Sequence, residues 1–515
     1  MRIGVPCESA AGENRVAATP KTVSELRTLG YDVLVEQGAG LKSGLTDAAY
    51  QEADALTVDR ATAWGADVVL RVNAPNDAEL GLMRPGAALI AFLEPRFVAD
   101  IVAKCATAGI TALSMDMVPR ISRAQSMDAL SSMANISGYR AVVEAVHAFG
   151  RFLGGQVTAA GKVPPANVFV IGTGVAGLAA IGVAGSMGAV VRATDVRPET
   201  AEQVESMGAT FVQVAPGAAD QGVSADGYAK ETTDDYNARA ALMYAEQVRQ
   251  ADIVITAAAI PGKASPRLIT AEMVGTMAPG SVIVDLAAAG GGNCELTKPG
   301  VSYVTASGVT IIGYTDMVSR LAGQSSRLYA RNVANLVTLL TPGKDGQFRV
   351  DFKDDIIRTA TITLDGAVTF PPPPVQVSAV PVTPPKAETE VRALPPKPPR
   401  PWQLDVALAA LAAVAVTCLL SFAPLQLLGS LAVFVLATVA GYYVVWNVTS
   451  ALHTPLMSLS NAISGIIIVG AMLQLANESW PIRILAALAV LVATVNVVGG
   501  FLVTNRMVSM FRKDA

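Results

Sequence analysis

Residues 170–180 read VIGTGVAGLAA, and this short run decides how the middle of the chain folds. An apolar, strand-like stretch leads into Gly172, Gly174 and Gly177, which fit the pattern G-x-G-x-x-G and open a helical stretch. Glycines at these positions permit a tight turn and let the backbone approach a pyrophosphate at the helix N-terminus. The run therefore predicts a dinucleotide site, with the backbone of Val175 at the pyrophosphate.

A carboxylate further along the chain adds to this interpretation. Asp195 lies 18 positions after Gly177, at the end of the strand-like run AVVRATD. A carboxylate there can bind the hydroxyls of the adenosine ribose and would repel a 2′-phosphate, which favours NAD(H) over NADP(H). Arg197 is a signal in the other direction, because a nearby arginine can bind such a phosphate. We expect Asp195, Val196 and Arg197 at the ribose of bound NAD(H).

Strand-like and helix-like segments alternate from residue 1 to about 365, and the series starts twice. YDVLVE, ADVVLRV and AALIAF belong to the first series, and NVFVIGTG, DIVIT and SVIVDL belong to the second. Strands separated by helical lengths are typical of parallel, doubly wound sheets. The predicted fold class is α/β, with two Rossmann-like lobes. The first lobe is residues 1–128 with about 325–365, where SSRLYARNVANLVTLL returns to it, and the second is 129–324.

The remainder of the chain reads as a tether followed by a membrane region. In the linker 366–401, 12 prolines fall between positions 371 and 401, and such density favours an extended polyproline chain. The transmembrane domain 402–515 contains four apolar runs of 18 to 22 residues, close to the roughly 20 that span a bilayer. Only Asp405, Glu478 and Arg483 are charged between 404 and 505. The four runs are about 404–423, 425–446, 459–476 and 482–503.

Charge and composition indicate where the protein is located and which partners it could have. Lys397 and Arg400 precede the first run, and Arg506, Arg512 and Lys513 follow the last, so the positive-inside rule puts both ends in the cytoplasm. The start, MRIGVPCESAAGENRV, has no apolar core of signal-peptide length. No basic tract with interleaved aromatics predicts nucleic-acid binding. Four scattered cysteines show no metal or disulfide spacing. We expect a multi-pass inner-membrane protein with a cytoplasmic N-terminal part.

The motifs MRIGVP, ENRVAATP, VEQGAG, GTGVAG and VDLAAAGGGN resemble the alanine dehydrogenase family. In that comparison the family's general acid/base histidine falls at Glu94, its acidic residue before the Gly-Gly pair falls at Ala289, and its substrate lysine falls at Arg71. Oxidation of an amino acid needs proton transfer at nitrogen. These departures therefore argue against amino-acid oxidation.

A longer resemblance covers essentially the whole chain. PRISRAQSMDALSSMANISGYRAVVEA, GKVPPA, GYTD and, in the membrane part, VVWNVTSALHTPLMSLSNAISG resemble the alpha subunits of bacterial proton-translocating nicotinamide nucleotide transhydrogenases. This resemblance implies direct hydride transfer between NADH on this chain and NADP⁺ on a beta subunit, coupled to inward proton translocation. It also implies an assembly of two alpha and two beta chains in a lipid bilayer. Direct transfer between two nicotinamides needs no general acid or base, which agrees with the missing histidine.

The resemblance also assigns roles to individual residues. It places the loop PRISRAQSMD at the nicotinamide, whereas the residues alone leave open a plain surface ion pair between Arg120 and Asp128. DGYAK, residues 226–230, resembles a loop that closes over the nucleotide. His453 lies between the second and third runs, either on a proton path or as a loop residue at the headgroups. The candidate catalytic residues are Arg120, Gln125, Asp128 and Ser131, and further cofactor-binding candidates are Ser126, Met127, Gly227 and Tyr228.

Two other functions remain open at this point. A membrane-tethered amino-acid dehydrogenase would form NADH from alanine without a partner subunit. An NAD(H)-sensing subunit of a transporter would bind the nucleotide and exchange no hydride.

Overall fold

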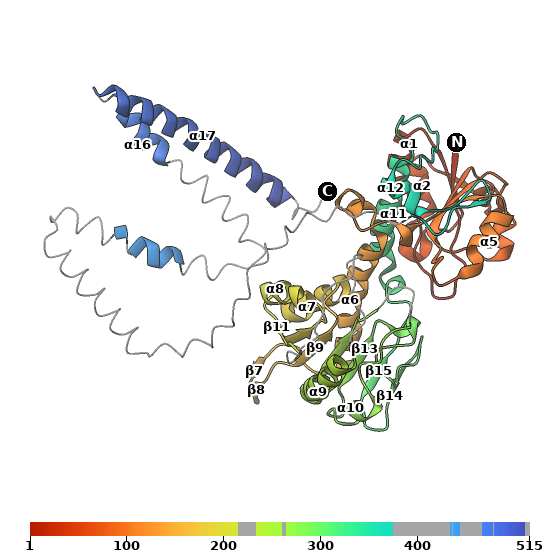
Figure 1. Ribbon diagram of the computed structural model, residues 1–515, viewed down its shortest axis with the longest axis horizontal. Coiled ribbons are helices and arrows are strands. Elements are labelled where there is room, and N and C mark those ends of the chain that lie inside the picture. Colours follow the sequence, from red (N-terminus) through yellow and green to blue (C-terminus); the bar gives the residue numbers. More distant parts are fainter. Residues whose placement is uncertain are drawn as a thin grey trace, which may run out of the picture. The chain divides into compact units, whose positions relative to one another are not determined.

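The computed structural model divides the chain into two compact units, Met1–Val382 and Thr383–Ala515. The N-terminal unit contains two α/β lobes, shown in Figure 1 in red to orange and in yellow to green, with helices on both faces of each sheet. The predicted fold class of two Rossmann-like doubly wound lobes is confirmed for this unit. The structure describes residues 1–214, 233–259, 264–373, 433–434, 436–442, 466–476 and 478–509.

The first lobe is built on an eight-stranded sheet in the order β17-β16-β6-β5-β4-β1-β2-β3. The six strands from β3 to β6 are parallel, and β16 and β17 complete one edge in antiparallel pairing. Apolar side chains pack on both faces of this sheet, as expected where helices cover both sides. The strands are β1 Arg2–Val5, β2 Asp32–Glu36, β3 Leu56–Val58, β4 Val68–Asn73, β5 Ala88–Phe92, β6 Thr111–Ser114, β16 Thr361–Leu364 and β17 Ala367–Val368.

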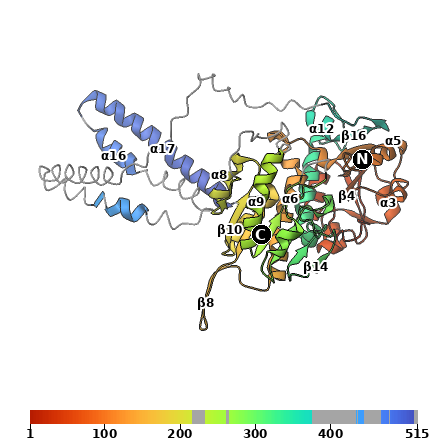
Figure 2. The same cartoon turned by 60° about the horizontal axis from the view of Figure 1, so that its bottom comes forward.

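The second lobe has a seven-stranded sheet in the order β11-β10-β9-β12-β13-β15-β14, and only β14 is antiparallel. The strand order reverses between β9 and β12, the place where doubly wound sheets bind ligands. A separate hairpin, β7–β8, extends from this lobe (Figure 2). The strands are β7 Gln156–Thr158, β8 Gly161–Val163, β9 Asn167–Ile171, β10 Val190–Thr194, β11 Thr210–Phe211, β12 Ile253–Thr256, β13 Val282–Asp285, β14 Ser302–Val304 and β15 Thr310–Ile312.

Two long helices join the lobes. The first half of α6, Ala129–Phe149, contributes Met133 and Ile136 to the core of the first lobe, while its second half contributes Val142 to the core of the second. This helix ends at Gly150, which adopts the left-handed conformation that commonly ends helices. Helix α11, Ala322–Leu339, runs back from the second lobe and packs in the first.

Shorter helices cover the two sheets. Several begin with a threonine, aspartate or asparagine whose side chain accepts a hydrogen bond from the first turn, as such caps do. The α-helices are α1 Pro20–Thr28, α2 Asp47–Glu52, α3 Arg60–Trp64, α4 Asp77–Leu80, α5 Ala99–Thr107, α7 Val175–Ser186, α8 Ala201–Ser206, α9 Asp234–Gln250, α10 Ala271–Gly275 and α12 Asp355–Ala360, and the 3₁₀ turns are η1 Leu41–Ser43, η2 Met115–Met117, η3 Ser122–Met127, η4 Pro198–Thr200, η5 Ala288–Gly290 and η6 Ser319–Leu321.

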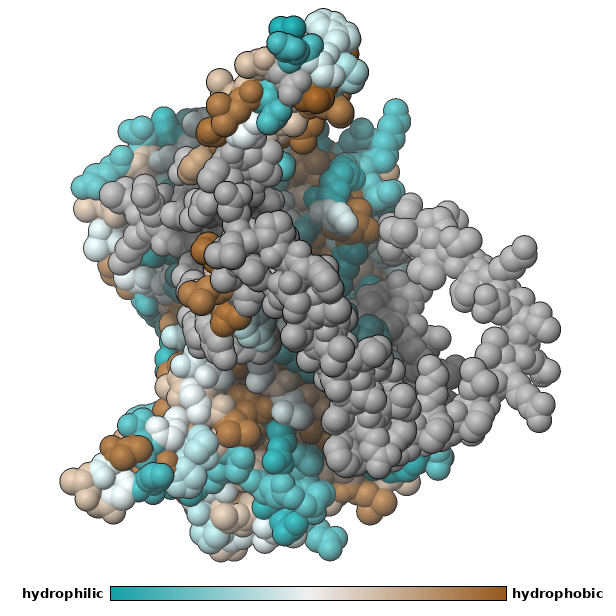
Figure 3. Space-filling view, turned by 90° about the vertical axis from the view of Figure 1, so that its left-hand side faces the viewer, coloured by the Kyte–Doolittle hydropathy of each residue, from teal (hydrophilic) through white to brown (hydrophobic). Residues whose placement is uncertain are grey.

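The described part of the C-terminal unit is helical and apolar. It contains α16, Ile466–Gln474, and α17, Trp480–Ser509, with brown, apolar side chains exposed on its surface (Figure 3). Within α17, the 20 residues Trp480–Gly499 are long and apolar enough to cross a membrane. The predicted run 404–423 lies outside the described residues, and the run 425–446 is described only in part. The count of four spans therefore stays a prediction.

Candidate functional site

A cleft of about 750 Å³ opens at the carboxyl ends of β9, β10 and β12, beside the N-terminus of α7. This is the point where the strand order of the second sheet reverses. Arg120, which precedes η3, and Ser131, in the first turn of α6, line one side of the cleft. Its volume lies within the roughly 300–1,000 Å³ of small-molecule and cofactor sites.

The glycine turn forms the floor of the cleft. Gly172 adopts a φ of +92°, a conformation that favours glycine. A Cβ atom at Gly177 would lie 1.8 Å from the carbonyl oxygen of Gly172, so no larger residue fits there. Helix α7 begins after Gly174, which has no side chain to cap it, and the first N–H groups of a helix attract anions. The turn therefore provides a backbone site for a phosphate group.

Asp195 lies at the end of β10 and is held by its neighbours. Thr173 donates to Oδ2 from its N–H group at 2.7 Å and from its hydroxyl at 3.1 Å. The guanidinium of Arg197 donates from Nε to Oδ1 at 2.8 Å and from Nη2 to Oδ2 at 2.9 Å. Burial opposes ionisation of this carboxyl, but the hydrogen bonds and charge of Arg197 outweigh burial and lower the pKa of Asp195. Asp195 is therefore ionised at neutral pH, and the positive charge of Arg197 is directed at it.

The segment 120–131 closes the side of the cleft nearest the first lobe. Asp128 caps α6, since its Oδ1 accepts from the N–H of Ser131 at 2.9 Å and its Oδ2 accepts from the Ser131 hydroxyl at 2.5 Å. Gln125 and Ser126 are exposed, whereas Met127 is buried in the core of the first lobe. Asp128 and Ser131 of this segment are therefore bonded to each other.

The cleft gathers most of the residues expected to bind a cofactor. Gln125, Ser126, Met127 and Asp128 lie in the adjoining loop and are not among the residues that line the cleft. Gly227, Tyr228 and His453 lie outside the described residues. The expected residues that line the cleft are Arg120, Ser131, Gly172, Gly174, Val175, Gly177, Asp195, Val196 and Arg197.

One face of α9 also lines the cleft, and the sequence did not predict these residues at the site. Tyr236, Ala240 and Tyr244 follow one another at intervals of four residues, so they lie on the same face of the helix. Burial raises the pKa of Tyr244 far above its usual value, and the nearby Tyr236 and Asp195 add to that effect. The helical period was visible in the sequence, but it does not distinguish a face that packs in a core from one that lines a site.

Asn293 holds two of the segments that line the cleft. Its Nδ2 donates to the carbonyl oxygens of Ala258 and Pro266, both at 2.8 Å, and its Oδ1 accepts from the N–H of Ala258 at 3.1 Å. The buried carboxylate of Asp285 holds the N–H of Asn293 at 2.8 Å. Two segments that line the cleft, around positions 258 and 266, are thereby fixed to the glycine-rich loop that ends at Asn293.

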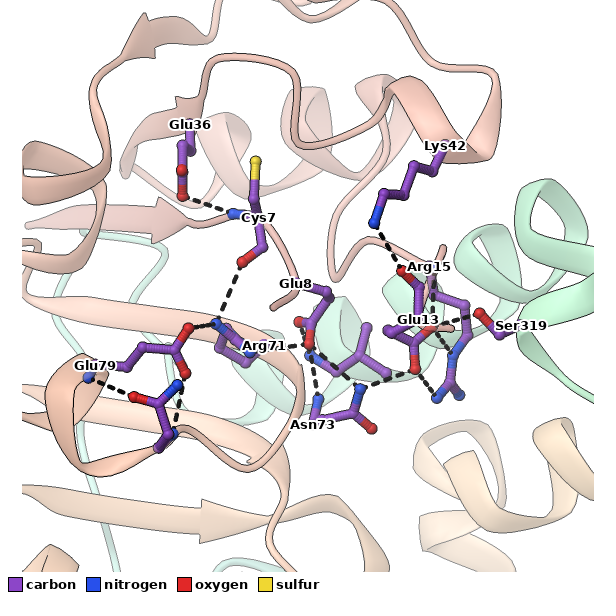
Figure 4. Close-up of polar contacts among 12 residues, drawn as sticks. Cys7, Glu8, Glu13, Arg15, Glu36, Lys42, Arg71, Asn73, Glu79 and Ser319 are labelled. Atoms are coloured by element: carbon purple, nitrogen blue, oxygen red, sulfur yellow. Dashed lines mark hydrogen bonds and ion pairs between the residues drawn. The ribbon is translucent and has the colours of Figure 1, made fainter. Parts of the chain in front are cut away.

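The first lobe contains a buried cluster of charged side chains. Figure 4 shows Arg71 between Glu8 and Glu79, and each of these carboxylates lies 3.1 Å from the guanidinium. Nearby, Glu13 pairs with Arg15 at 2.6 Å and accepts from Asn73 at 2.8 Å. Arg71 and Arg15 are thus each paired with a carboxylate of this chain.

Comparison with known proteins agrees with this architecture. Residues 4–137 and 141–371 match the N-terminal and C-terminal domains of the alanine dehydrogenase/PNT family. Residues 430–513 match the 4TM region of pyridine nucleotide transhydrogenase. The NAD(P) transhydrogenase subunit alpha of Haemophilus influenzae is 53% identical over 515 residues, covering the full length of both chains. This chain belongs to the transhydrogenase alpha-subunit family. Its C-terminal unit is accordingly a membrane region.

Two further relatives extend the family assignment. The NAD(P) transhydrogenase subunit alpha of Cereibacter sphaeroides is 49% identical over 525 residues and is likewise covered in full. The crystal structure of a transhydrogenase from Sinorhizobium meliloti has a TM-score of 0.65 and 41% sequence identity, covering 72% of this chain and 100% of that chain. The Cereibacter protein thus matches this chain over its whole length, whereas the solved structure matches 72% of it.

Proposed function

We propose that this chain is the NAD(H)-binding alpha subunit of a membrane NAD(P) transhydrogenase. It presents the nicotinamide of NAD(H) to NADP(H) bound on a beta subunit, and hydride passes directly between them while protons move inward across the membrane. The observation that carries the proposal is the cleft at the switch point of the second sheet. It combines a glycine turn, an open helix N-terminus and an ionised Asp195.

These residues fit NAD(H) better than NADP(H). The N–H groups at the start of α7 hold the pyrophosphate, and Gly177 lets α7 pack closely on the turn, because a Cβ atom there would lie 1.8 Å from the Gly172 carbonyl oxygen. The Asp195 carboxylate accepts hydrogen bonds from the ribose and repels a 2′-phosphate. Arg197 can support this selection, because its charge is already paired with Asp195. The face of α9 with Tyr236 and Tyr244 offers apolar surface for the adenine.

The bound nicotinamide supplies the hydride. The chain positions this nicotinamide and does not act as a general acid or base. Among the described residues that line the cleft, Asp195 is the only carboxylate, and it is bonded to Arg197. The chain has two histidines, of which His147 is exposed on α6. Arg120, Gln125, Asp128 and Ser131 would fix the nicotinamide, with Ser126 and Met127 in the same turn. Holding the two reacting carbons roughly 3–3.5 Å apart makes the transfer effectively unimolecular, and this positioning can supply a large part of the rate enhancement.

The membrane region would supply the driving force. A potential of 100 mV provides about 2.3 kcal/mol for each charge moved, which shifts an equilibrium roughly fiftyfold. We propose four spans, cytoplasmic ends and an assembly of two alpha and two beta chains. Gly227 and Tyr228 would belong to a loop over the nucleotide, and His453 is a candidate for the proton path.

The test uses the full-length chain assembled with its beta subunit in membrane vesicles. NADH labelled with deuterium at C4 is supplied together with NADP⁺, and we expect the label at C4 of the NADPH formed, together with proton uptake or release by the vesicles. Label that exchanges with water, or NADH formation driven by alanine, would contradict the proposal. Nucleotide binding without any transfer would instead support a sensor.

A further inference from the structure

The backbone carbonyl of Ser126 receives two side-chain hydrogen bonds from the same helix. In α11, Nδ2 of Asn332 donates to it at 2.9 Å and Nδ2 of Asn335 donates to it at 2.8 Å. The donors are three positions apart, so they lie on one face of the helix and converge on one oxygen. A carbonyl oxygen has two lone pairs, and these amides can occupy both. More than 200 residues of sequence separate the loop from the helix.

The same loop is held at other points as well. Arg123 forms a two-pronged ion pair with Asp354, with contacts of 2.6 and 2.9 Å, and Asp354 also caps α12. Ala124 and Met127 are buried in the core of the first lobe. Side chains on either side of Gln125 are therefore anchored, while Gln125 itself is exposed. The loop is fixed through its backbone and its neighbours, and Gln125 remains available to a ligand.

Asn332 is a costly residue in this position unless its amide nitrogen is needed. It is 6% exposed, and its Oδ1 is a buried acceptor that has no hydrogen-bond partner among the described residues. A leucine of similar size would fill the same space and leave no unpaired polar atom. Exchanging the amide oxygen and nitrogen would turn Oδ1 toward the Ser126 carbonyl, which is unfavourable. The hydrogen bond that Asn332 makes from this position goes to the Ser126 carbonyl.

We propose that Asn332 and Asn335 are positioning residues for hydride transfer, because they hold the Ser126 carbonyl and so fix Gln125 and Asp128 at the nicotinamide. This inference rests on the proposed function and adds to it two residues outside the nucleotide cleft. The adenosine and pyrophosphate contacts lie on the second lobe. Loosening the loop should therefore slow the transfer step more than it weakens nucleotide binding.

The test compares the variants Asn332→Leu, Asn335→Ala and the double variant in the assembled membrane complex. Single-turnover hydride transfer and the dissociation constant of NADH are measured for each. Displacing a reacting group by about 1 Å can cost about a hundredfold in rate, and we expect a loss of roughly tenfold to a hundredfold in the double variant. Its NADH affinity should change by less than about threefold. For each single variant, the fall in the logarithm of the transfer rate should be less than half of that in the double variant, because the other amide still holds the carbonyl.

Arg331→Ala is the matched control, since Arg331 lies on the same helix and pairs with Glu25 at the surface. We expect its rate and affinity within about twofold of the unmodified complex. A double variant with an unchanged transfer rate would overturn the inference, and so would parallel losses of rate, NADH affinity and thermal stability, which indicate a structural role. An unmodified complex that transfers no hydride would instead contradict the proposed function.

Discussion

Gly138 of α6 lies directly against Ala176 in the first turn of α7. A Cβ atom built on Gly138 would lie 1.9 Å from the carbonyl oxygen of Ala176, far closer than any real contact. Helix α6 carries the first lobe at one end and the second at the other, and α7 begins at the glycine turn. At this contact α6, which joins the lobes, packs on α7, the helix that would bind the pyrophosphate.

We expect Gly138→Ala to destabilise the N-terminal unit and to weaken NADH binding. The added methyl group meets backbone atoms, so the two helices must separate, and overpacking of this kind costs about 1–3 kcal/mol. Thermal unfolding and NADH titration of the assembled complex measure both effects. Gly185→Ala on α7 is the control, because a Cβ atom there meets open space. The control should be neutral or stabilising by up to about 1 kcal/mol. Equal behaviour of the two variants would refute the close contact.

Asp195→Asn should weaken NADH binding and reduce discrimination against a 2′-phosphate. The amide cannot repel the phosphate, and Arg197 would lose the carboxylate that neutralises it. We expect at least about a tenfold fall in the preference for 5′-AMP over 2′,5′-ADP as competitors of bound NADH, because charged hydrogen bonds are the strong ones. Asp252→Asn, at the opposite end of the same sheet, is the matched control. An unchanged preference would argue against Asp195 as the ribose ligand.

The acid stability of the first lobe should depend on Glu13. Burial disfavours its carboxylate, but the hydrogen bonds and charge of Arg15 outweigh burial and lower the pKa of Glu13 from 4.5 to about 2. Because the folded-state pKa is lowered, the stabilisation is complete above pH 4.5 and is lost as the pH falls toward 2. The difference corresponds to about 3 kcal/mol at neutral pH.

Glu13→Gln should therefore lower the unfolding temperature at pH 7 and flatten its decline between pH 4.5 and about 2, the window set by this pKa. Glu52→Gln, at an exposed position, should change neither. If the Glu13 variant kept the acid dependence of the unmodified chain, another carboxylate would have to be responsible.

Arg71→Ala should be strongly destabilising. Arg71 is fully buried and pairs with both Glu8 and Glu79, so its removal takes the paired cation from the buried Glu8 and leaves Glu79 with only the half-exposed Arg60. Loss of one partner from a buried pair costs about 3–5 kcal/mol. Arg84→Ala removes a half-exposed partner of Asp67 and should cost less than about 1 kcal/mol. Denaturant unfolding of the two variants gives the comparison, and similar losses would count against the buried cluster.

Some strands could not be predicted from the sequence, because they form only by pairing with a neighbouring strand. Strands β14, β16 and β17 have two to four residues each and lie at or next to a sheet edge, where the neighbouring strand supplies the hydrogen bonds. Their local pattern is too short to separate them from loops. The long helix α6 spans Ala129–Phe149 because Gly150 ends it.

The sequence alone determined the two doubly wound lobes and the glycine turn with Asp195. These features depend on periodicity and on conformations open to glycine over fewer than about 30 neighbouring residues. Only the tertiary structure decided that Tyr236 lines the cleft, that Asn293 holds the segment at Ala258 and that Asn332 binds the Ser126 carbonyl. Each is brought there by packing between elements distant in the chain, and no local preference of the backbone records which distant residue a side chain will meet.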